Sequence, residues 1–386
     1  MQNFQFVNPT KIIFGKGEIL KLTNEIPANS KILVLYGGGS VKKTGLLEKI
    51  KEVLKDYTLG EFGGIEPNPT YETLMKAVEV IRKEGYNFLL AVGGGSVIDG
   101  TKFIAAAVPF TQGDPWKFVA ERLPIEKAVP FATVLTLPAT GSEMNNGAVI
   151  TRKSLRAKLP FLSFAVFPQF SILDPVYTYT LPPKQIANGV VDAFIHVMEQ
   201  YMTYPVNGKV QDRFAEGLLL TLVEEGPKAL QEPENYDVRA NLMWTATLAL
   251  NGLIGSGVPQ DWSTHLVGHE ITALYGLDHA QTLAIVLPSM LEVMKKEKST
   301  KLLQYGERIW NAPEDLSIEE KEQFAIDKTR SFFETMGVKT RFSDYGLDRE
   351  VIEEIIASLE AHGMVKIGEK GTVTPHIIRQ VLEFSL

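Results

Sequence analysis

A group of residues in the second half of the chain has the types and spacing that suit a metal ion. Asp192 and His196 are four residues apart in the helical stretch VVDAFIHVME, so their side chains project from one face about one turn apart. His265 and His269 repeat that spacing, and His279 follows in YGLDHAQTLAIVLP. Imidazole and carboxylate donors suit borderline divalent metals, and an open coordination position would leave room for a substrate.

A single histidine in a helix is more often an ordinary residue whose ring nitrogens hydrogen-bond to a neighbouring group than a metal ligand. The combination of these residues favours a metal, because they lie in largely apolar stretches where unpaired polar groups are costly. Cysteine is absent from the chain, so a metal must use His, Asp or Glu. The segment is not the metalloprotease pattern H-E-x-x-H, because Leu266 follows the first histidine.

Glycine-rich segments form a second chemical feature. The tetrapeptide GGGS occurs at residues 37–40 and again at 93–96, and the small, hydroxylated segment TLPATGSE occupies residues 136–143. Each follows an apolar run, and a glycine at a strand end lets backbone N–H groups approach a phosphate. Neither tetrapeptide belongs to a G-x-G-x-x-G or P-loop pattern, and each alone could simply make a tight turn. Their repetition favours a nucleotide or another phosphate.

The first glycine segment also bears on the choice of nicotinamide cofactor. An acid near the end of an early strand usually binds the free ribose hydroxyls of NAD. Here Lys42 and Lys43 follow the glycines, and no acid occurs between them and Glu48. With Ser40 and a lysine as ligands for a 2′-phosphate, we expect NADP rather than NAD. An exposed helix start is the alternative interpretation of the two lysines.

The elements that must position these residues divide the chain into two halves. Apolar runs at residues 31–36, 86–92 and 131–138 alternate with helical segments, which indicates parallel strands in βαβ units. From about residue 172 the apolar residues follow a helical period, with Pro182 and Pro183 at a helix start. We predict an α/β dinucleotide-binding domain over residues 1–180 and an all-helical metal-binding domain over 181–386. Asp99 and Glu143 beside the glycine loops are either helix caps or pocket groups.

Composition excludes several classes of protein. The 386 residues are 45% hydrophobic and 22% charged, as in ordinary globular proteins. The net charge of −7 is scattered, which argues against nucleic acid and membrane surfaces as partners. No apolar run is long enough for a membrane helix, and the first residues do not have the pattern of a signal peptide. We therefore expect a cytoplasmic protein.

With these residues in view, the sequence resembles the iron-containing (group III) alcohol dehydrogenases, in the branch of butanol dehydrogenases and NADPH-dependent aldehyde reductases. The similarity extends from FGKG at residues 14–17 to the C-terminus. It rests on GGIEPNP (63–69), AVGGGSVIDGTK (91–102), TLPATGSEMN (136–145), DPVYTYTLPP (174–183), NGVVDAFIHVMEQY (188–201), and HLVGHE and DHA between residues 265 and 280.

The resemblance implies a Rossmann-like parallel-sheet domain followed by a helical domain, as in dehydroquinate synthase, and commonly a homodimer. It implies one divalent metal, zinc or iron, with the ligands Asp192, His196, His265 and His279. His269 corresponds to a histidine beside the metal that is not a ligand, and we assign His269 and Asp99 to the catalytic set. The implied cofactor-binding residues are Gly38, Ser40, Asn68, Gly94, Gly95, Ser96, Thr136, Thr140, Ser142, Asn145 and Lys158, the last in less standard surroundings.

The expected reaction is hydride transfer between NADP(H) and short- to medium-chain aldehydes or primary alcohols. The metal acts as a Lewis acid on the aldehyde oxygen, and His269 or ordered water moves the proton. A dehydroquinate synthase-like lyase or a glycerol dehydrogenase-like enzyme of the same fold is the alternative. The lyase would need several basic residues for a phosphorylated acid substrate, and the helical half offers few near its motifs. A nucleotide sensor that kept the fold is a third, non-enzymatic possibility.

Overall fold

The computed structural model describes all residues, 1–386, in two compact units. The N-terminal unit comprises Val7–Leu181 and Pro233–Thr247, and the helical unit comprises Met1–Phe6, Pro182–Glu232 and Leu248–Leu386. The main boundary between the units therefore falls after Leu181, just before the first long helix. Two segments depart from the predicted division at residue 180: Met1–Phe6 belongs to the helical unit and Pro233–Thr247 to the N-terminal unit. Contacts in space, rather than chain order, decide to which unit a segment belongs.

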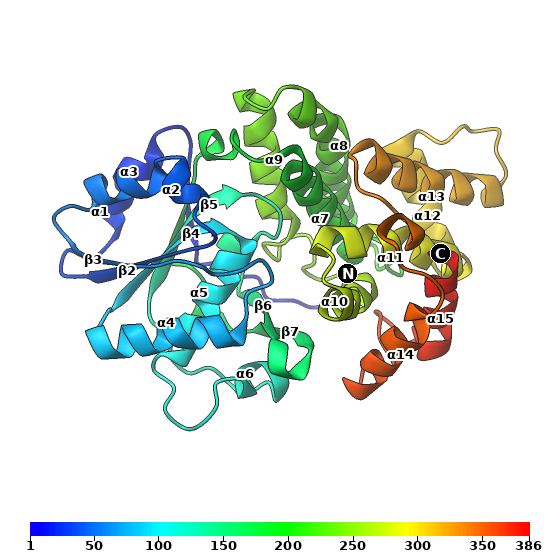
Figure 1. Ribbon diagram of the computed structural model, residues 1–386. Helices are drawn as coiled ribbons and strands as arrows, with labels where there is room; N and C mark the ends of the chain where they lie inside the picture. The colour runs from blue at the N-terminus through cyan, green and yellow to red at the C-terminus, as the bar shows by residue number, and fades with distance from the viewer. The chain divides into compact units, whose positions relative to one another are not determined.

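A six-stranded, all-parallel sheet forms the centre of the N-terminal unit (Figure 1). Its strand order is β1-β8-β5-β4-β2-β3, the order of a doubly wound sheet with crossovers. The strands are β1 (Lys11–Phe14), β2 (Lys31–Tyr36), β3 (Thr58–Phe62), β4 (Phe88–Gly94), β5 (Phe131–Leu137) and β8 (Phe170–Leu173). The predicted parallel α/β fold is confirmed. A separate antiparallel hairpin, β6 (Gly147–Arg152) and β7 (Ala157–Leu162), was not predicted.

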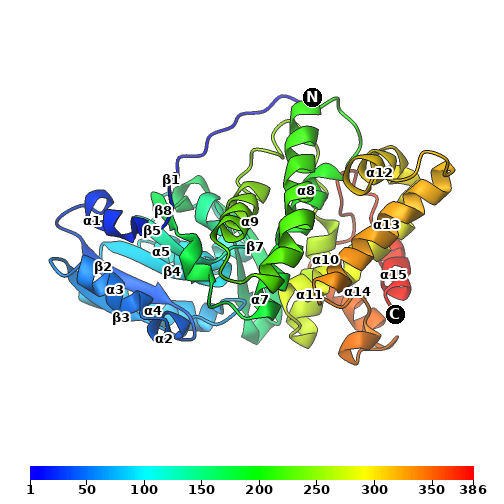
Figure 2. The ribbon, with the colours of Figure 1, turned by 90° about the horizontal axis from the view of Figure 1, so that it is seen from above.

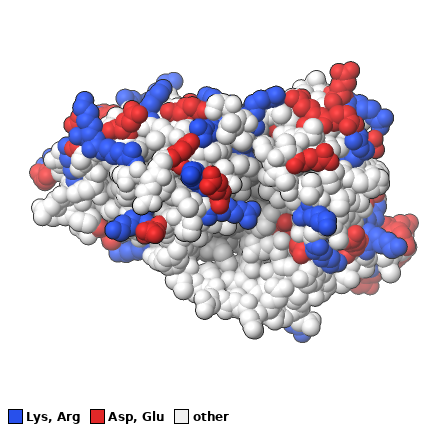
Figure 3. Space-filling model, turned by 90° about the horizontal axis from the view of Figure 1, so that it is seen from below, with Lys and Arg blue, Asp and Glu red and all other residues white.

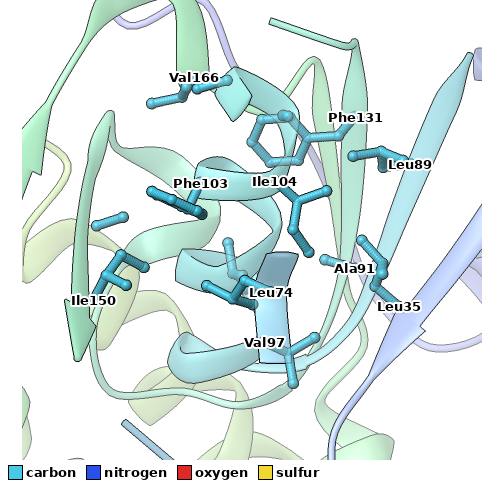
Figure 4. Close-up of a cluster of buried hydrophobic side chains, with 14 of the residues drawn as sticks. Leu35, Leu74, Leu89, Ala91, Val97, Phe103, Ile104, Phe131, Ile150 and Val166 are labelled. Atoms are coloured by element: carbon cyan, nitrogen blue, oxygen red, sulfur yellow. The ribbon is translucent and has the colours of Figure 1, made fainter. Parts of the chain in front are cut away.

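Alternation along the strands gives this sheet two apolar faces. On β2, Leu33 and Leu35 face one core cluster, while Ile32 and Val34 face the other. The first face packs on α4 (Tyr71–Glu84) and α5 (Gly95–Ala107), as Figure 4 shows around Leu35, Leu74 and Ile104. The second face is covered by α1 (Leu22–Glu25) and α3 (Leu46–Val53). The short helices α2 (Ser40–Lys43) and α6 (Lys117–Ala120) complete the unit, together with most of α9 (Tyr236–Ala249).

The helical unit consists of helices packed on one another (Figure 2). They are α7 (Pro183–Tyr201), α8 (Lys209–Gln231), α10 (Ser263–Tyr275), α11 (His279–Val293), α12 (Lys295–Trp310), α13 (Ile318–Thr335), α14 (Val351–Ala361) and α15 (Pro375–Phe384). Pro183 opens α7, as predicted from the tolerance of the first helical turn for proline. One apolar cluster joins α10 and α11 to α14 and α15. Helix α7 packs against both α8 and α11, which places it between other helices.

The surface carries charges of both signs. On the face shown in Figure 3, Lys and Arg side chains alternate with Asp and Glu rather than forming an area of one sign. This face has no basic stripe of the kind that follows a phosphate backbone. No helix combines the length and the apolar character that crossing a membrane requires.

Candidate metal centre and nucleotide loops

Helix α7, which is buried from Ile186 onward except at Asn188, presents a polar stripe. Lys184, Asn188, Asp192 and His196 follow one another at four-residue spacing, so they share one face. Near the N-terminus of α7, two side chains of this stripe contact Asp278. Asn188 Nδ2 lies 3.1 Å and Lys184 Nζ lies 2.7 Å from Asp278 Oδ2. Asp278 caps α11 through a capping box, and α11 begins at the next residue. The stripe therefore fixes the start of α11 beside the Asp192 carboxylate.

The donors predicted to bind a metal lie close together within the helical unit. Ligand atoms of Asp192, His265 and His279 all lie within 4.8 Å of one another. His279 Nε2 is 3.6 Å and His196 Nδ1 is 3.9 Å from Asp192 Oδ1. The rings of His196 and His265 stack with centroids 4.7 Å apart. One carboxylate and several imidazoles, held largely out of water, form a donor set that fits a divalent cation such as zinc or iron.

His269 lies beside this cluster. Its ring centroid is 5.1 Å from that of His279 and 6.2 Å from that of His265. Neither His269 nor His196 belongs to the group of three donors within 4.8 Å of one another, but His196 Nδ1 lies 3.9 Å from Asp192 Oδ1. His269 is thus placed next to two proposed ligand rings.

Glu199 is a buried carboxylate next to the cluster, and sequence reasoning missed it. Its Oε1 atom accepts the backbone N–H of His265 at 2.9 Å and lies 3.1 Å from His265 Nδ1. Burial raises the pKa of the Glu199 carboxyl well above its usual range, as does the Asp261 carboxylate, whereas the His265 N–H and the Lys298 ammonium lower it. The available signal was an acid three residues after His196 in an apolar run, the spacing at which helix side chains are neighbours.

The segment that leads into α10 is anchored and locally strained. Asp261 Oδ2 lies 2.6 Å from Lys298 Nζ, and its Oδ1 accepts the Ser263 N–H at 2.9 Å. Trp262 has a φ of 64°, in the left-handed region that a bulky residue rarely adopts. Its ring contacts that of His265 with centroids 5.2 Å apart. Strain of this kind concentrates at functional sites, where surrounding contacts hold it in place.

In the N-terminal unit, the three predicted loops lie at one edge of the sheet. Strands β2, β4 and β5 are neighbours and parallel, so the segments that follow their carboxyl ends converge. Gly94 is the residue before α5 and Gly95 is its first residue. A Cβ at Gly95 would lie 2.4 Å from Thr140, and one at Gly94 would lie 2.9 Å from Leu137. These glycines let the second and third loops approach closely at the N-terminus of α5, where a phosphate would be stabilised.

Three other predicted cofactor residues lie in the loop around Asn68, in the first glycine loop and in the β6–β7 hairpin. The Asn68 N–H donates to Ser96 Oγ at 3.3 Å, and Asn68 has a φ of 56°. Gly38 has open space where a side chain would lie. Lys158 is buried on β7, paired with Thr151 of β6. The structure therefore places the 68 loop against the second glycine loop, and places Lys158 in the hairpin.

A buried polar cluster ties α5 to the third loop. Lys102 Nζ donates to Ser142 Oγ and Asn145 Oδ1, both at 2.8 Å, and burial lowers its pKa to about 8. Asp99 accepts from Ser142 Oγ at 2.6 Å and from the Val149 N–H at 2.8 Å, so both of its carboxylate oxygens are engaged. Asp99 is thus part of the buried cluster that holds the third loop at Ser142. Lys102, which belongs to the same cluster, was not singled out from the sequence.

An acid also lies near the first glycine loop, although none precedes Glu48 in the adjacent sequence. Glu61, on β3, is 3.6 Å from Lys42 Nζ and 2.6 Å from Lys51 Nζ, and it accepts from the Tyr36 hydroxyl. The Lys42 ammonium also lies 5.1 Å from the centre of the Tyr36 ring. Strand β3 pairs beside β2, so an acid distant in sequence reaches the loop. Part of the positive charge predicted there is therefore shared with Glu61.

A parallel-sheet unit with glycine loops at its carboxyl edge, and a helical unit with a carboxylate–imidazole cluster, are the features expected of a metal-dependent dehydrogenase. Residues 9–175 match the family model described as iron-containing alcohol dehydrogenase, and residues 186–374 match the C-terminal model of the Fe-containing alcohol dehydrogenase family. The chain belongs to the iron-containing alcohol dehydrogenase family, as the resemblance predicted.

Individual relatives match over the whole chain. The NADPH-dependent aldehyde reductase YqhD of Escherichia coli (strain K12) is 58% identical over 385 residues, which cover 99% of each chain. The probable NADH-dependent butanol dehydrogenase 1 of Bacillus subtilis (strain 168) is 40% identical and covers 100% of both chains. The crystal structure of E. coli K-12 YqhD superposes with a TM-score of 0.98, covering 100% of this chain and 99% of that one. NADH-dependent butanol dehydrogenase A from Thermotoga maritima, at 34% identity, gives a TM-score of 0.94 with 100% and 99% coverage.

Proposed function

We propose that this enzyme reduces small aldehydes to primary alcohols with NADPH and a divalent metal. The observation that carries the proposal is the convergence of Asp192, His265 and His279 within 4.8 Å in a chain of this family. The relative at 58% identity is named for NADPH and aldehyde, whereas relatives at 40% and 38% are named for NADH and butanol. NADPH is therefore the favoured reductant, with NADH less favoured.

The metal would be held by Asp192, His196, His265 and His279. When bound, a divalent zinc or iron ion supplies Lewis-acid polarisation of the substrate oxygen. The chain's own contribution is to keep these donors in place with little rearrangement. The polar stripe of α7 holds two of them one turn apart and fixes the start of α11, so the donor set is largely preorganised.

His269 is proposed to move the proton. Each aldehyde that takes up a hydride at carbon also takes up one proton at oxygen, so one NADPH and one proton are consumed for each alcohol formed. His269 lies beside the donor cluster, and imidazole exchanges protons near neutral pH. It can give the proton to the product oxygen directly or through a water molecule.

The sheet edge of the N-terminal unit is proposed to bind the cofactor. The pyrophosphate would lie at the N-terminus of α5, where backbone N–H groups and the helix dipole favour negative charge. We assign Gly94, Gly95 and Ser96 to the pyrophosphate, Gly38, Ser40 and Asn68 to the adenosine ribose, and Thr136, Thr140, Ser142, Asn145 and Lys158 to the nicotinamide end. Asp99, with Lys102, is proposed to act by positioning the loop that bears Ser142.

Oxidation of NADPH or NADH by butanal, followed at 340 nm beside metal analysis of protein purified without added metal, tests this function. We expect about one zinc or iron ion per chain and faster turnover with NADPH. A lyase of the same fold would consume no net NADPH, and a nucleotide sensor would show no turnover. Either result contradicts the proposal.

His269→Ala is expected to retain the metal and to lose mainly rate. Positioned proton transfer typically contributes about 10²–10⁴-fold, so kcat should fall within that range while the metal content stays near that of the parent. Loss of the metal from this variant would instead identify His269 as a ligand. The measurement is metal content beside steady-state kinetics with NADPH and butanal.

A homodimer and a cytoplasmic location complete the proposal. Phe4, Phe6, Val210 and Phe214 of the helical unit are 42–56% exposed, and a second copy could cover apolar side chains of this kind. Light scattering is expected to give about twice the mass of the 42.8 kDa chain, and a monomer at assay concentration would contradict this.

A chain without cysteine needs no oxidising compartment, which supports the proposed cytoplasmic location.

A further inference from the structure

We infer that Glu199 is a positioning residue of the metal centre, because it orients the His265 ring and joins α7 to α10, two of the three helices that supply the proposed ligands. The inference rests on the proposed metal site. Glu199 lies on α7, three residues after His196, and it contacts α10 at His265. Its side chain is 3% exposed and that of His265 is 7% exposed, so water does not compete for this contact.

Glu199 holds the start of α10 at three points. Its backbone carbonyl accepts the Asp261 N–H at 2.9 Å. Its Oε1 atom accepts the His265 N–H at 2.9 Å and lies 3.1 Å from His265 Nδ1. These contacts lie on either side of Trp262, whose φ of 64° turns the chain into α10. These three contacts therefore fix both the backbone and the ring of His265 relative to α7.

The same oxygen also determines which ring nitrogen carries the hydrogen. A divalent cation on His265 favours the ionised form of Glu199, and an ionised carboxylate only accepts, so in the metal-bound site the Nδ1 atom 3.1 Å from Oε1 is the donor. A neutral imidazole with a hydrogen on Nδ1 presents the lone pair of Nε2. His265 would thus bind the metal through Nε2. A carboxylate behind a histidine ligand also raises the basicity of the ring, and such partners are worth about 10–100-fold in metal affinity.

Glu270, on α10 like His265, provides a comparison for Glu199. Its Oε1 atom lies 2.9 Å from His362 Nδ1, and its other oxygen accepts from Ser358. It is thus a second carboxylate–imidazole pair with a buried carboxylate, on α10, but its histidine is 22% exposed and is not a proposed ligand. If Glu199 acts only as a buried acceptor that stabilises helices, the Glu270 pair should matter to the metal just as much.

The experiment measures zinc affinity of the full-length metal-free chain by competition with a chromogenic chelator, for the parent, Glu199→Ala, Glu199→Gln and Glu270→Gln. We expect a dissociation constant about 10–100-fold weaker for Glu199→Ala. Glu199→Gln retains an acceptor and loses the negative charge, so we expect a smaller loss of about tenfold. Glu270→Gln should bind zinc like the parent. The d–d absorption of the cobalt-loaded proteins should change in both Glu199 variants and remain unchanged in Glu270→Gln, because only Glu199 contacts a ligand.

The outcomes separate this inference from the function beneath it. If the parent binds no zinc, the proposed metal site itself fails. If the parent binds zinc and both Glu199 variants match it in affinity and cobalt spectrum, Glu199 has no positioning role. Equal weakening in Glu199→Ala and Glu270→Gln would show general loosening and would also overturn the inference. Should Glu199→Ala fail to fold, Glu199→Gln decides by the same two measurements.

Discussion

Replacing His279 with alanine is expected to remove the bound metal and aldehyde reduction together. His279 is the first residue of α11 and its side chain is 23% exposed, so alanine there should leave the helix intact. The capping box that begins α11 depends on Asp278 and is retained. Loss of Lewis-acid stabilisation worth several kcal/mol should lower kcat/KM by about 10³-fold or more. Metal analysis should find little zinc or iron, against about one ion per parent chain.

His376→Ala is the comparison for that variant, because His376 lies on α15 and is exposed. It should keep both metal and activity. NADPH binding, followed by cofactor fluorescence, should survive in His279→Ala, since the proposed cofactor residues belong to the other unit. Full metal occupancy in His279→Ala would show that His279 is not a ligand. Loss of NADPH binding would show that the substitution disturbs the structure beyond the metal site.

Features of this site that depend on local spacing could be predicted from the sequence. Asp192 and His196 share a helix face because four residues make about one turn. The glycines at residues 93–95 end a buried strand and begin a helix. Strand end and helix start are consecutive in the sequence, so the local pattern is enough to predict both. Parallel pairing then brings the loop ends to one edge, whichever neighbours the strands have.

Features that depend on which elements become neighbours could not be predicted from the sequence. Glu61 reaches Lys42 only because β3 pairs beside β2, and Glu199 reaches His265 only because α7 packs near α10. Both acids are ordinary helix or strand residues in the sequence. Asp99 is a related case, since its partners Ser142 and Val149 lie on another loop and strand. Contacts of this kind follow from tertiary packing, which periodicity does not encode.

The first glycine loop is the place where a carboxylate should reverse the cofactor preference. Gly39 is unsuitable, because its φ of 97° would strain any side chain. Gly38 has no positive φ, and nothing lies within 4 Å of the position that its Cβ would occupy. Gly38→Asp therefore places a negative charge near Ser40 without a backbone penalty. If the loop reads the 2′-phosphate of NADPH, this charge repels it and offers an acceptor to the free hydroxyl of NADH.

The expected result for Gly38→Asp is a KM that rises for NADPH much more than for NADH. A charged hydrogen bond gained or lost is worth about 1.5–3 kcal/mol, so the ratio of the two kcat/KM values should move by at least about tenfold. Gly38→Asn has the same shape without the charge, and it should shift the ratio far less. Glu61 lies 3.6 Å from Lys42 Nζ, so we expect the parent preference to rest chiefly on backbone N–H groups and Ser40. These remain in both variants, which leaves the added charge as the difference. Equal shifts in Asp and Asn variants, or a parent enzyme that prefers NADH, would show that this loop does not read the 2′-position.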